Sequence, residues 1–169
     1  MASGDTLLIF TPHANEPPTS NFATLDMRNL HPVLDFDDTT DEEAVFSAVM
    51  PRNYAGGGLT LTLGWSATDT TVTPQNCVWQ AAFERIADDA QDLDSDSFAD
   101  FNTSGAVAEA SASGELSYDA ITFTDGADMD SVAVGELFRL KIRRDADDTS
   151  GTDSLVGDAE LSFVEIKET

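Results

Sequence analysis

The feature that most constrains this chain is a run of alternating residues that follows a glycine-rich segment. From Leu59 to Trp65 every second residue is apolar, and threonine or glycine fills the positions between. This period of two is the pattern of a β-strand with one buried face, because successive side chains point to opposite sides. Threonine suits the outer face of a strand, and the glycines at 56–58 permit backbone angles that other residues avoid. We therefore predict a strand over residues 59–68.

Further strand patterns occur along the chain, and no segment has a convincing amphipathic helical period. Residues 43–50 are apolar nearly throughout and fit either a buried strand or a short helix, but Pro51 ends them at the length of a strand. A change of face between Phe163 and Val164 suggests a β-bulge in the last strand. The predicted strands occupy residues 22–27, 32–37, 43–50, 59–68, 77–86, 106–111, 117–124, 136–144 and 159–166.

Many short strands separated by turn signals predict an all-β protein, an antiparallel β-sandwich of the jelly-roll type. An immunoglobulin-like sandwich is the alternative, although its Cys…Trp…Cys spacing is absent. We expect residues 59–68 and 77–86 to pair as a hairpin, joined by a turn at 72–76, and to place Trp65 and Trp79 in one core. The single cysteine, Cys77, excludes an intramolecular disulfide and fits a buried position.

The length of 169 residues predicts one domain. We divide it into an extended N-terminal arm, residues 1–30, and a single β-sandwich domain, residues 31–169. The arm is extended because its prolines remove hydrogen-bond donors. Its candidate interface residues are Leu7, Leu8, Ile9 and Phe10. They dock either on their own domain as an edge strand or on a neighbouring subunit.

The chain is strongly acidic, since 32 acidic residues against eight basic ones leave a net charge of −24. Such a surface repels nucleic acid and anionic membranes, and no apolar run approaches the ~18 residues of a membrane span. We therefore expect neither nucleic acid nor a membrane as a partner. The acidic surface suits salty surroundings, where screening shortens the repulsion, and it equally suits a cationic partner.

Half of the basic residues gather on one predicted strand, residues 136–144. They are Arg139, Lys141, Arg143 and Arg144. Two interpretations are open for this basic stripe. It forms cross-strand ion pairs with acids of neighbouring strands, or it presents a positive patch to an acidic neighbouring subunit. The four residues are therefore candidate interface residues.

Patterns for catalysis and metal binding are weak. No Gly-x-Ser-x-Gly elbow, His-x-x-x-His or paired-cysteine motif occurs, so we expect a protein that is not an enzyme and holds no cofactor. One aspartate-rich loop follows EF-hand spacing, but Ser97 and Thr103 stand where that motif needs glycine and glutamate. A solvated loop is the favoured interpretation of these calcium candidates, Asp92, Asp94, Asp96 and Asp100.

Several short motifs, taken in their order and spacing, resemble a known family. They are Pro51, Asn53-Tyr54, Gly56-Gly57, Leu59-Thr60, Trp65, Asn76, Val78-Trp79, Arg144-Asp145, Asp147-Asp148, Gly157-Asp158-Ala159-Glu160-Leu161 and Val164-Glu165-Ile166. Over residues 33–168 the chain resembles small β-sandwich proteins of tailed phages and prophages, which are virion-associated. The resemblance brings no catalytic residue, and it leaves residues 1–30 outside its span.

The resemblance implies a structural virion protein of a bacteriophage. Its specific form is a capsid decoration (cement) protein on the outer surface of the capsid, bound to the major capsid protein as a homotrimer. The arm would then hook onto the shell or a neighbouring subunit by strand addition. The alternative is a tail or fibre module that binds host-surface glycans, with calcium in the loop at 92–100. It needs exposed aromatic residues, for which Tyr54, Phe98 and Phe101 are the loop candidates. A hydrolase would need an ordered pair of carboxylates in a cleft.

Overall fold

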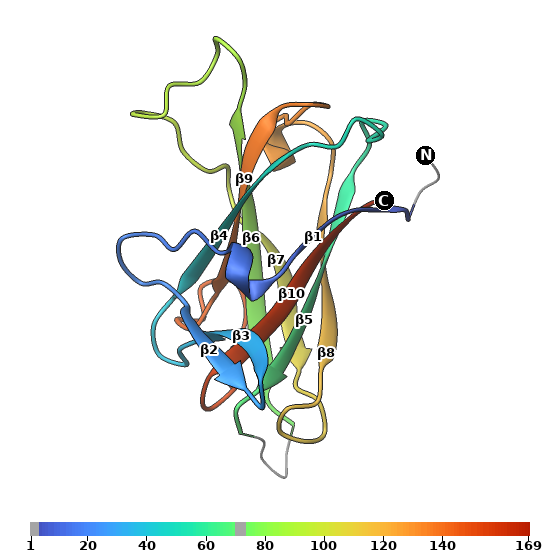
Figure 1. Ribbon diagram of the computed structural model, residues 1–169. Helices are drawn as coiled ribbons and strands as arrows, with labels where there is room; N and C mark the ends of the chain where they lie inside the picture. The colour runs from blue at the N-terminus through green and yellow to red at the C-terminus, as the bar shows by residue number, and fades with distance from the viewer. Residues whose placement is uncertain (1–3, 70–73) are drawn as a thin grey trace.

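The computed structural model describes residues 4–69 and 74–169 and shows two packed antiparallel sheets (Figure 1). Sheet A has the order β2 (Thr24–Arg28), β3 (His31–Phe36), β10 (Ala159–Glu168), β5 (Leu59–Ala67) and β8 (Ser117–Phe123), and β1 (Thr6–Phe10) also pairs with β10. Sheet B has the order β4 (Glu43–Val49), β9 (Leu137–Arg144), β6 (Asn76–Ile86) and β7 (Asn102–Ala108). Two short 3-10 turns are η1 (Pro12–Ala14) and η2 (Ala127–Met129). The protein is an antiparallel β-sandwich of the jelly-roll type, as predicted.

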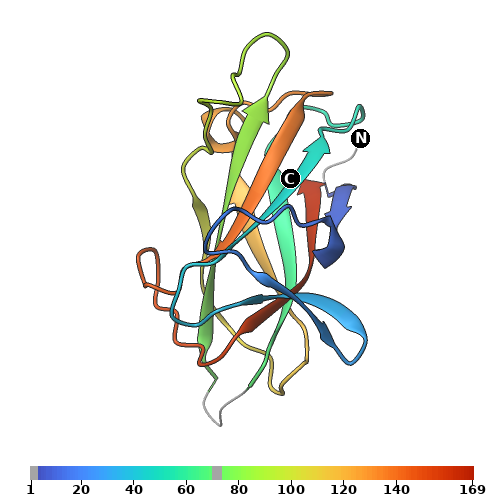
Figure 2. The same ribbon diagram turned by 60° about the vertical axis from the view of Figure 1, so that its left-hand side comes forward.

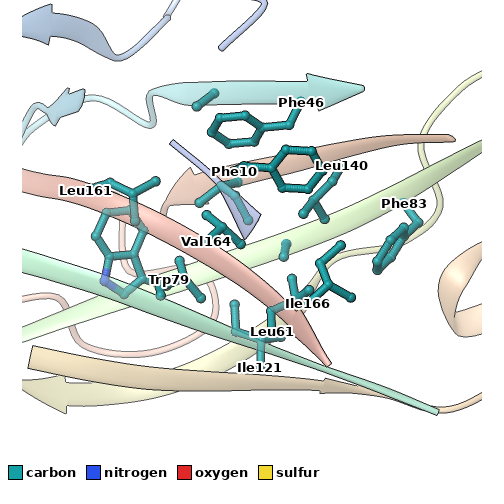
Figure 3. Packing of buried hydrophobic residues seen from close by; sticks show 14 of the residues in the cluster. Phe10, Phe46, Leu61, Trp79, Phe83, Ile121, Leu140, Leu161, Val164 and Ile166 are labelled. Atoms are coloured by element: carbon teal, nitrogen blue, oxygen red, sulfur yellow. The ribbon is translucent and has the colours of Figure 1, made fainter. Parts of the chain in front are cut away.

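The apolar faces of the two sheets meet in one core. The apolar residues from Leu59 to Trp65 are fully buried, whereas the threonines between them keep partial exposure. Residues 43–49, ambiguous by sequence, form strand β4. Trp65 and Trp79 share the core as predicted, with ring centroids 6.0 Å apart at 65°. Figure 3 shows the surrounding aliphatic side chains of both sheets packed into this layer. In the described ranges, no helix has the length and apolar character needed to cross a bilayer.

The predicted hairpin of residues 59–68 and 77–86 is wrong. β5 lies in sheet A between β10 and β8, and β6 lies in sheet B between β9 and β7. The turn expected at 72–76 lies partly outside the described residues. Alternation could not distinguish the two arrangements, because strands that share a sheet and strands that face each other across a core bury the same sides.

The bulge predicted in the last strand is present, slightly earlier than expected. The register of β10 against β5 shifts between Leu161 and Phe163, which makes Ser162 the extra residue. Leu161 and Val164 are both buried. Phe163 lies on the outer face of sheet A, where its ring occupies the space that a side chain at Gly64 would fill.

The N-terminal segment is extended, as predicted, but it belongs to the sandwich and does not protrude from it. β1 pairs with β10, and Phe10 is buried with its ring centroid 5.1 Å from that of Phe46 (Figure 3). Residues 15–23 then run beside the edge of β4, where Glu16 N donates to the carbonyl of Val45. Of the two docking modes left open by the sequence, the structure has the one on its own domain.

The boundary expected at residue 30 does not separate two parts of the molecule. β2 and β3 pair across it as a hairpin, with Arg28 opposite His31, and β3 continues into sheet A by pairing with β10. Residues 1–3 of the expected arm lie outside the described part. The sequence of residues 1–30 predicts a separate arm because prolines and short apolar runs give no local sign that the partner strand, β10, lies at the other end of the chain.

Candidate functional site

The outer face of sheet B, which we call the closed face, carries the basic stripe. Its three outward cations each pair with an acid of a neighbouring strand or loop. The pairs are Arg139–Glu84 at 2.8 Å, Lys141–Glu43 at 2.8 Å and Arg143–Asp41 at 3.5 Å. Phe98 and Phe101 lie over these cations, at 4.1 to 5.9 Å from the charged groups to the ring centroids. The stripe is thus paired within its own chain, and a contact with another subunit stays a prediction.

Arg144, the fourth candidate interface residue, is not on this face, and the prediction is wrong for it. Successive side chains of a strand alternate, so Arg144 points inward where Arg143 points outward. Its guanidinium is fully buried, pairs with Asp153 at 2.8 Å and donates to three backbone carbonyls. It therefore anchors the loop that follows β9, and it cannot meet a partner.

The aspartate-rich loop does not gather its carboxylates. The Asp92 carboxylate accepts a hydrogen bond from the backbone N–H of Asp94 at 3.0 Å, which closes a local turn. Over the part of the chain that the structure describes, no cation-sized group of oxygens forms among the four candidates, Asp92, Asp94, Asp96 and Asp100.

A different set of acids comes together instead. One oxygen each of Asp41, Asp145 and Asp147 lies within 4.8 Å of the others. The carboxylate of Asp145 already accepts four hydrogen bonds from Thr149 and Ser150, which lower its pKa although burial opposes the shift. Asp41 forms the ion pair with Arg143 on the closed face. Two of the three carboxylates, those of Asp41 and Asp145, are thus already bound by groups of the chain itself.

Three of the four N-terminal interface candidates pack against the protein's own core. Phe10 is buried, Leu7 and Leu8 are half-buried against the core, and Ile9 is 62% exposed. The backbone that strand addition to a shell would use on one side of β1 is paired with β10. The strand addition to a capsid shell that a cement protein is predicted to make through Leu7–Phe10 therefore has no support from this segment.

The outer face of sheet A, which we call the open face, carries a groove of about 670 Å³. Ser66 of β5 and Ser162 of β10 lie on its floor. Its walls come from residues 28–33 at the β2–β3 turn, from residues 113–116 before β8, and from Thr11-Pro12. Figure 1 shows the β2–β3 hairpin and the loop before β8 at the same end of the molecule. The volume lies within the usual range of ligand sites.

Arg28 ties two walls of the groove to its floor. Its Nη1 forms an ion pair with buried Glu160 and donates to a backbone carbonyl of β5, and its Nη2 donates to Ser113 Oγ at 2.7 Å. Glu160 also accepts a hydrogen bond from Ser66 Oγ at 2.9 Å. A Cβ at Gly114 would lie 2.9 Å from the guanidinium nitrogens, so the loop packs directly on Arg28. These contacts hold the groove in shape.

Tyr118, which is exposed, and Phe163, which is half-buried, form an aromatic pair next to the groove. The strand register places both beside Gly64, and their ring centroids lie 5.5 Å apart at 55°. Tyr118 is 65% exposed. A Cβ at Gly64 would lie 2.1 Å from the Phe163 ring, so only glycine lets this ring lie on β5. Neither ring lines the groove itself, but Phe163 directly follows Ser162 of the floor along β10, and Gly64 is two residues from Ser66 on the same side of β5.

Asp35 and Glu160 are opposite each other on β3 and β10. Burial, followed by the charges of Glu160 and Asp26, raises the pKa of Asp35 to about 6. The Oδ1 atom of Asp35 is buried without a hydrogen-bond partner among the described residues. Glu160 is itself buried and does not line the groove. The two carboxyls therefore do not form the accessible pair that a hydrolase would need.

Sequence reasoning missed the residues of the open face. It counted Tyr118 and Phe163 among strand aromatics, and it identified only loop aromatics as accessible. Two local signals pointed to them. Gly64 interrupts a strand, which is typical of a close approach by another group. The change of face between Phe163 and Val164 means that one of these two apolar residues must lie on the outer face of the sheet. The role of Arg28 has no such signal, because its partners lie far away in the sequence.

No protein-family model matches the chain, and no curated protein matches it. Solved structures share its fold. The CBM22-2 xylan-binding domain of Paenibacillus barcinonensis Xyn10C has a TM-score of 0.52 at 10% identity, over 92% of both chains. The CBM22-1–GH10 modules of Clostridium thermocellum endo-1,4-β-D-xylanase 10B, complexed with xylohexaose, give a TM-score of 0.52 at 10% identity, over all of this chain and 29% of that one. A family GH115 4-O-methyl-α-glucuronidase gives 0.53 at 8% identity, over 99% and 18%. At these identities the similarity concerns the fold.

Proposed function

We propose that this protein is a non-catalytic module that binds a glycan on its open face. The observation that carries the proposal is a groove with an aromatic pair beside it, in which Tyr118 is exposed and Phe163 is half-buried. Sugar rings present C–H faces that pack on aromatic rings, and hydroxyl groups that need hydrogen-bond partners. The Tyr118–Phe163 pair offers the first kind of contact on the open face. The groove offers the second through the hydroxyl groups of Ser66, Ser113 and Ser162, of which those of Ser66 and Ser113 already donate within the chain, to Glu160 and to the Thr68 carbonyl, and keep lone pairs to accept.

Two further observations support this choice of face and ligand. The loop aromatics of the closed face, Phe98 and Phe101, already lie over the cations of β9. A domain that shares the fold is described as xylan-binding, which makes polysaccharides the first ligand class to test. Because a fold does not by itself assign a function, the proposal rests on the residues of the open face.

The test is a glycan array followed by titration calorimetry on the best ligand. We expect the double variant Tyr118→Ala/Phe163→Ala to bind at least tenfold more weakly, a loss of about 1.4 kcal/mol. The matched control, Phe98→Ala/Phe101→Ala, removes two aromatic rings from the opposite face and should keep the wild-type affinity. A wild-type protein that binds no glycan, or equal losses in the two double variants, would contradict the proposal.

A separate proposal concerns the place where the module acts. The motifs within residues 33–168 that resemble phage β-sandwich proteins support a virion, and a glycan-binding face favours the tail or fibre. A cement protein, trimeric and bound to the major capsid protein, would need a contact other than Leu7–Phe10. Adding the purified protein to expanded capsids tests this alternative. Binding with increased mechanical stability would favour the capsid, and absence of binding would exclude it.

A further inference from the structure

We propose that the open face selects a single, uncharged polysaccharide chain and rejects both acidic polysaccharides and the flat surfaces of crystalline ones. This inference rests on the proposed function, because it specifies the ligand class of the same groove. Three features carry it: the ion pair that the cation of the groove already forms, the charges around the groove, and the angle between the rings of Tyr118 and Phe163.

The first feature is Arg28, the one arginine or lysine among the described residues that line the groove. Its charge is already neutralised by Glu160, whose side chain is only 7% exposed, and its Nη2 is bonded to Ser113. A uronate or sulfate group would have to share Arg28 with this carboxylate. Two negative charges would then compete for one cation, and weakening the ion pair of the buried Glu160 is unfavourable. Arg28 is therefore a positioning residue of the groove wall and not a receptor for anions.

The second feature is the charge around the floor. Asp26 and Asp35 lie on the β2–β3 hairpin, and Asp158 is close enough to add to the repulsion on Asp35. Lys167, further along β10, is close in sequence to Glu165 on the same side of the strand. An anionic sugar would add another negative charge near these acids, and salt screens the repulsion beyond the Debye length of ~8 Å at physiological ionic strength. The chain as a whole has a charge of −24. A neutral sugar avoids this repulsion.

The third feature is the geometry of the aromatic pair. The rings of Tyr118 and Phe163 are inclined by 55° and share no plane. The walls at residues 28–33 and 113–116 line the same groove as Ser162, which directly precedes Phe163 on β10. A flat crystalline surface could rest on one ring at most and would be held away by the walls. A single chain can rotate about its glycosidic bonds and turn successive sugar faces toward the two rings.

The test of charge selectivity compares matched polymers on the intact protein by affinity electrophoresis and calorimetry. Polygalacturonate and glucuronoxylan are each measured beside their carboxyl-reduced forms, which keep the backbone and lose the charge, in a panel that also holds neutral polysaccharides. We expect every bound backbone to be bound at least about fivefold more tightly in its uncharged form at low salt, with a smaller difference at high salt. An acidic polymer that binds more tightly than its reduced form would overturn the inference.

The physical cause is tested with Glu160→Gln, which removes the counter-charge of Arg28. We expect this variant to gain at least about threefold in affinity for the acidic form relative to the reduced form. Ser66→Ala is the comparison variant, because it deletes a hydrogen bond of the same network without a change of charge. As a groove residue it should weaken binding of the acidic and reduced forms alike and leave the ratio of the two affinities unchanged. Should Glu160→Gln not fold, Asp35→Asn removes a negative charge beside the groove with the same expected direction. If the affinity ratio does not change in the folded variant, the electrostatic inference is wrong.

The test of chain selectivity is a depletion assay with amorphous and crystalline forms of cellulose and chitin. We expect greater binding to the amorphous forms, and greater capacity for a crystalline form would overturn the inference. The outcomes also distinguish the two proposals. Binding of no polysaccharide contradicts the proposed function. Binding of acidic or crystalline polymers that depends on Tyr118 and Phe163 leaves that function intact and removes only this inference.

Discussion

The two outer faces of the sandwich have the same strand alternation but differ in what covers them. On the closed face, the outward cations of β9 are paired with acids and lie beneath Phe98 and Phe101. On the open face, Tyr118 packs against the half-buried Phe163 and is itself 65% exposed. Figure 2 shows β4, β9 and β6 of the closed face side by side, with the long connection after β6 rising beyond their end.

This difference indicates that the loops between strands, more than the strands themselves, decide which face of a sandwich can bind a ligand. The connection between β6 and β7 returns to sheet B, where Ala99 N donates to the carbonyl of Phe83. Residues 15–23 cover the edge of β4. Sheet A instead has the β2–β3 hairpin and the loop before β8 at one end, where they form walls. Function is expected where loops frame a surface and do not fill it.

The largest expected effect distinguishes the buried cation of β9 from the cations of the closed face. Arg144→Met leaves Asp153, whose side chain is 2% exposed, as a buried charge without its partner. We expect the free energy of unfolding to fall by roughly 3–5 kcal/mol, measured by urea denaturation. The adjacent variant Arg143→Met removes a partly exposed pair at 3.5 Å and should cost about 1 kcal/mol. Equal losses would show that the two cations are not held differently.

The second prediction concerns Gly64, on which the aromatic pair of the open face depends. Gly64→Ala places a methyl group where the Phe163 ring now lies, so the ring must move away from Tyr118. We expect a destabilisation of about 1–3 kcal/mol from overpacking and weaker glycan binding. The control is the same change in a Phe163→Ala background, where the methyl group has space. If Gly64→Ala costs as much there, the ring is not the reason for the glycine.

The smallest expected effect depends on pH and tests the charges beside the groove. The folded state raises the pKa of Asp35 from 3.8 to about 6, so the folded protein holds this proton more tightly than the unfolded chain. The resulting stability is present below pH 3.8 and is lost as the pH rises through 6. Asp35→Asn should therefore gain about 1 kcal/mol above pH 6, after allowance for solvent screening, and little near pH 4.

Urea denaturation across this pH range measures the effect. Asp26→Asn removes a more exposed acid of the same cluster and should change stability less. A variant Asp35→Asn with a constant difference from wild type at every pH would contradict the raised pKa.

Two properties could be predicted from local sequence: which residues form a strand, and which face of that strand is buried. The strand from Leu59 to Trp65 and the outward Arg139, Lys141 and Arg143 are examples, because a period of two identifies a half-buried strand without knowledge of its partner. The candidate site was not predictable in this way. Its wall depends on Arg28, whose partners Glu160 and Ser113 lie on distant segments.

The sequence by itself determined the all-β class, the apolar face of each main strand and the burial of Trp65 and Trp79. Only the tertiary structure decided that β5 and β6 lie in opposite sheets, that the N-terminal segment joins sheet A, and that one outer face is covered while the other is open. The physical reason is that alternation records which side of a strand is buried. The partner of that strand, and the loop that crosses its outer side, depend on contacts between residues far apart in the chain.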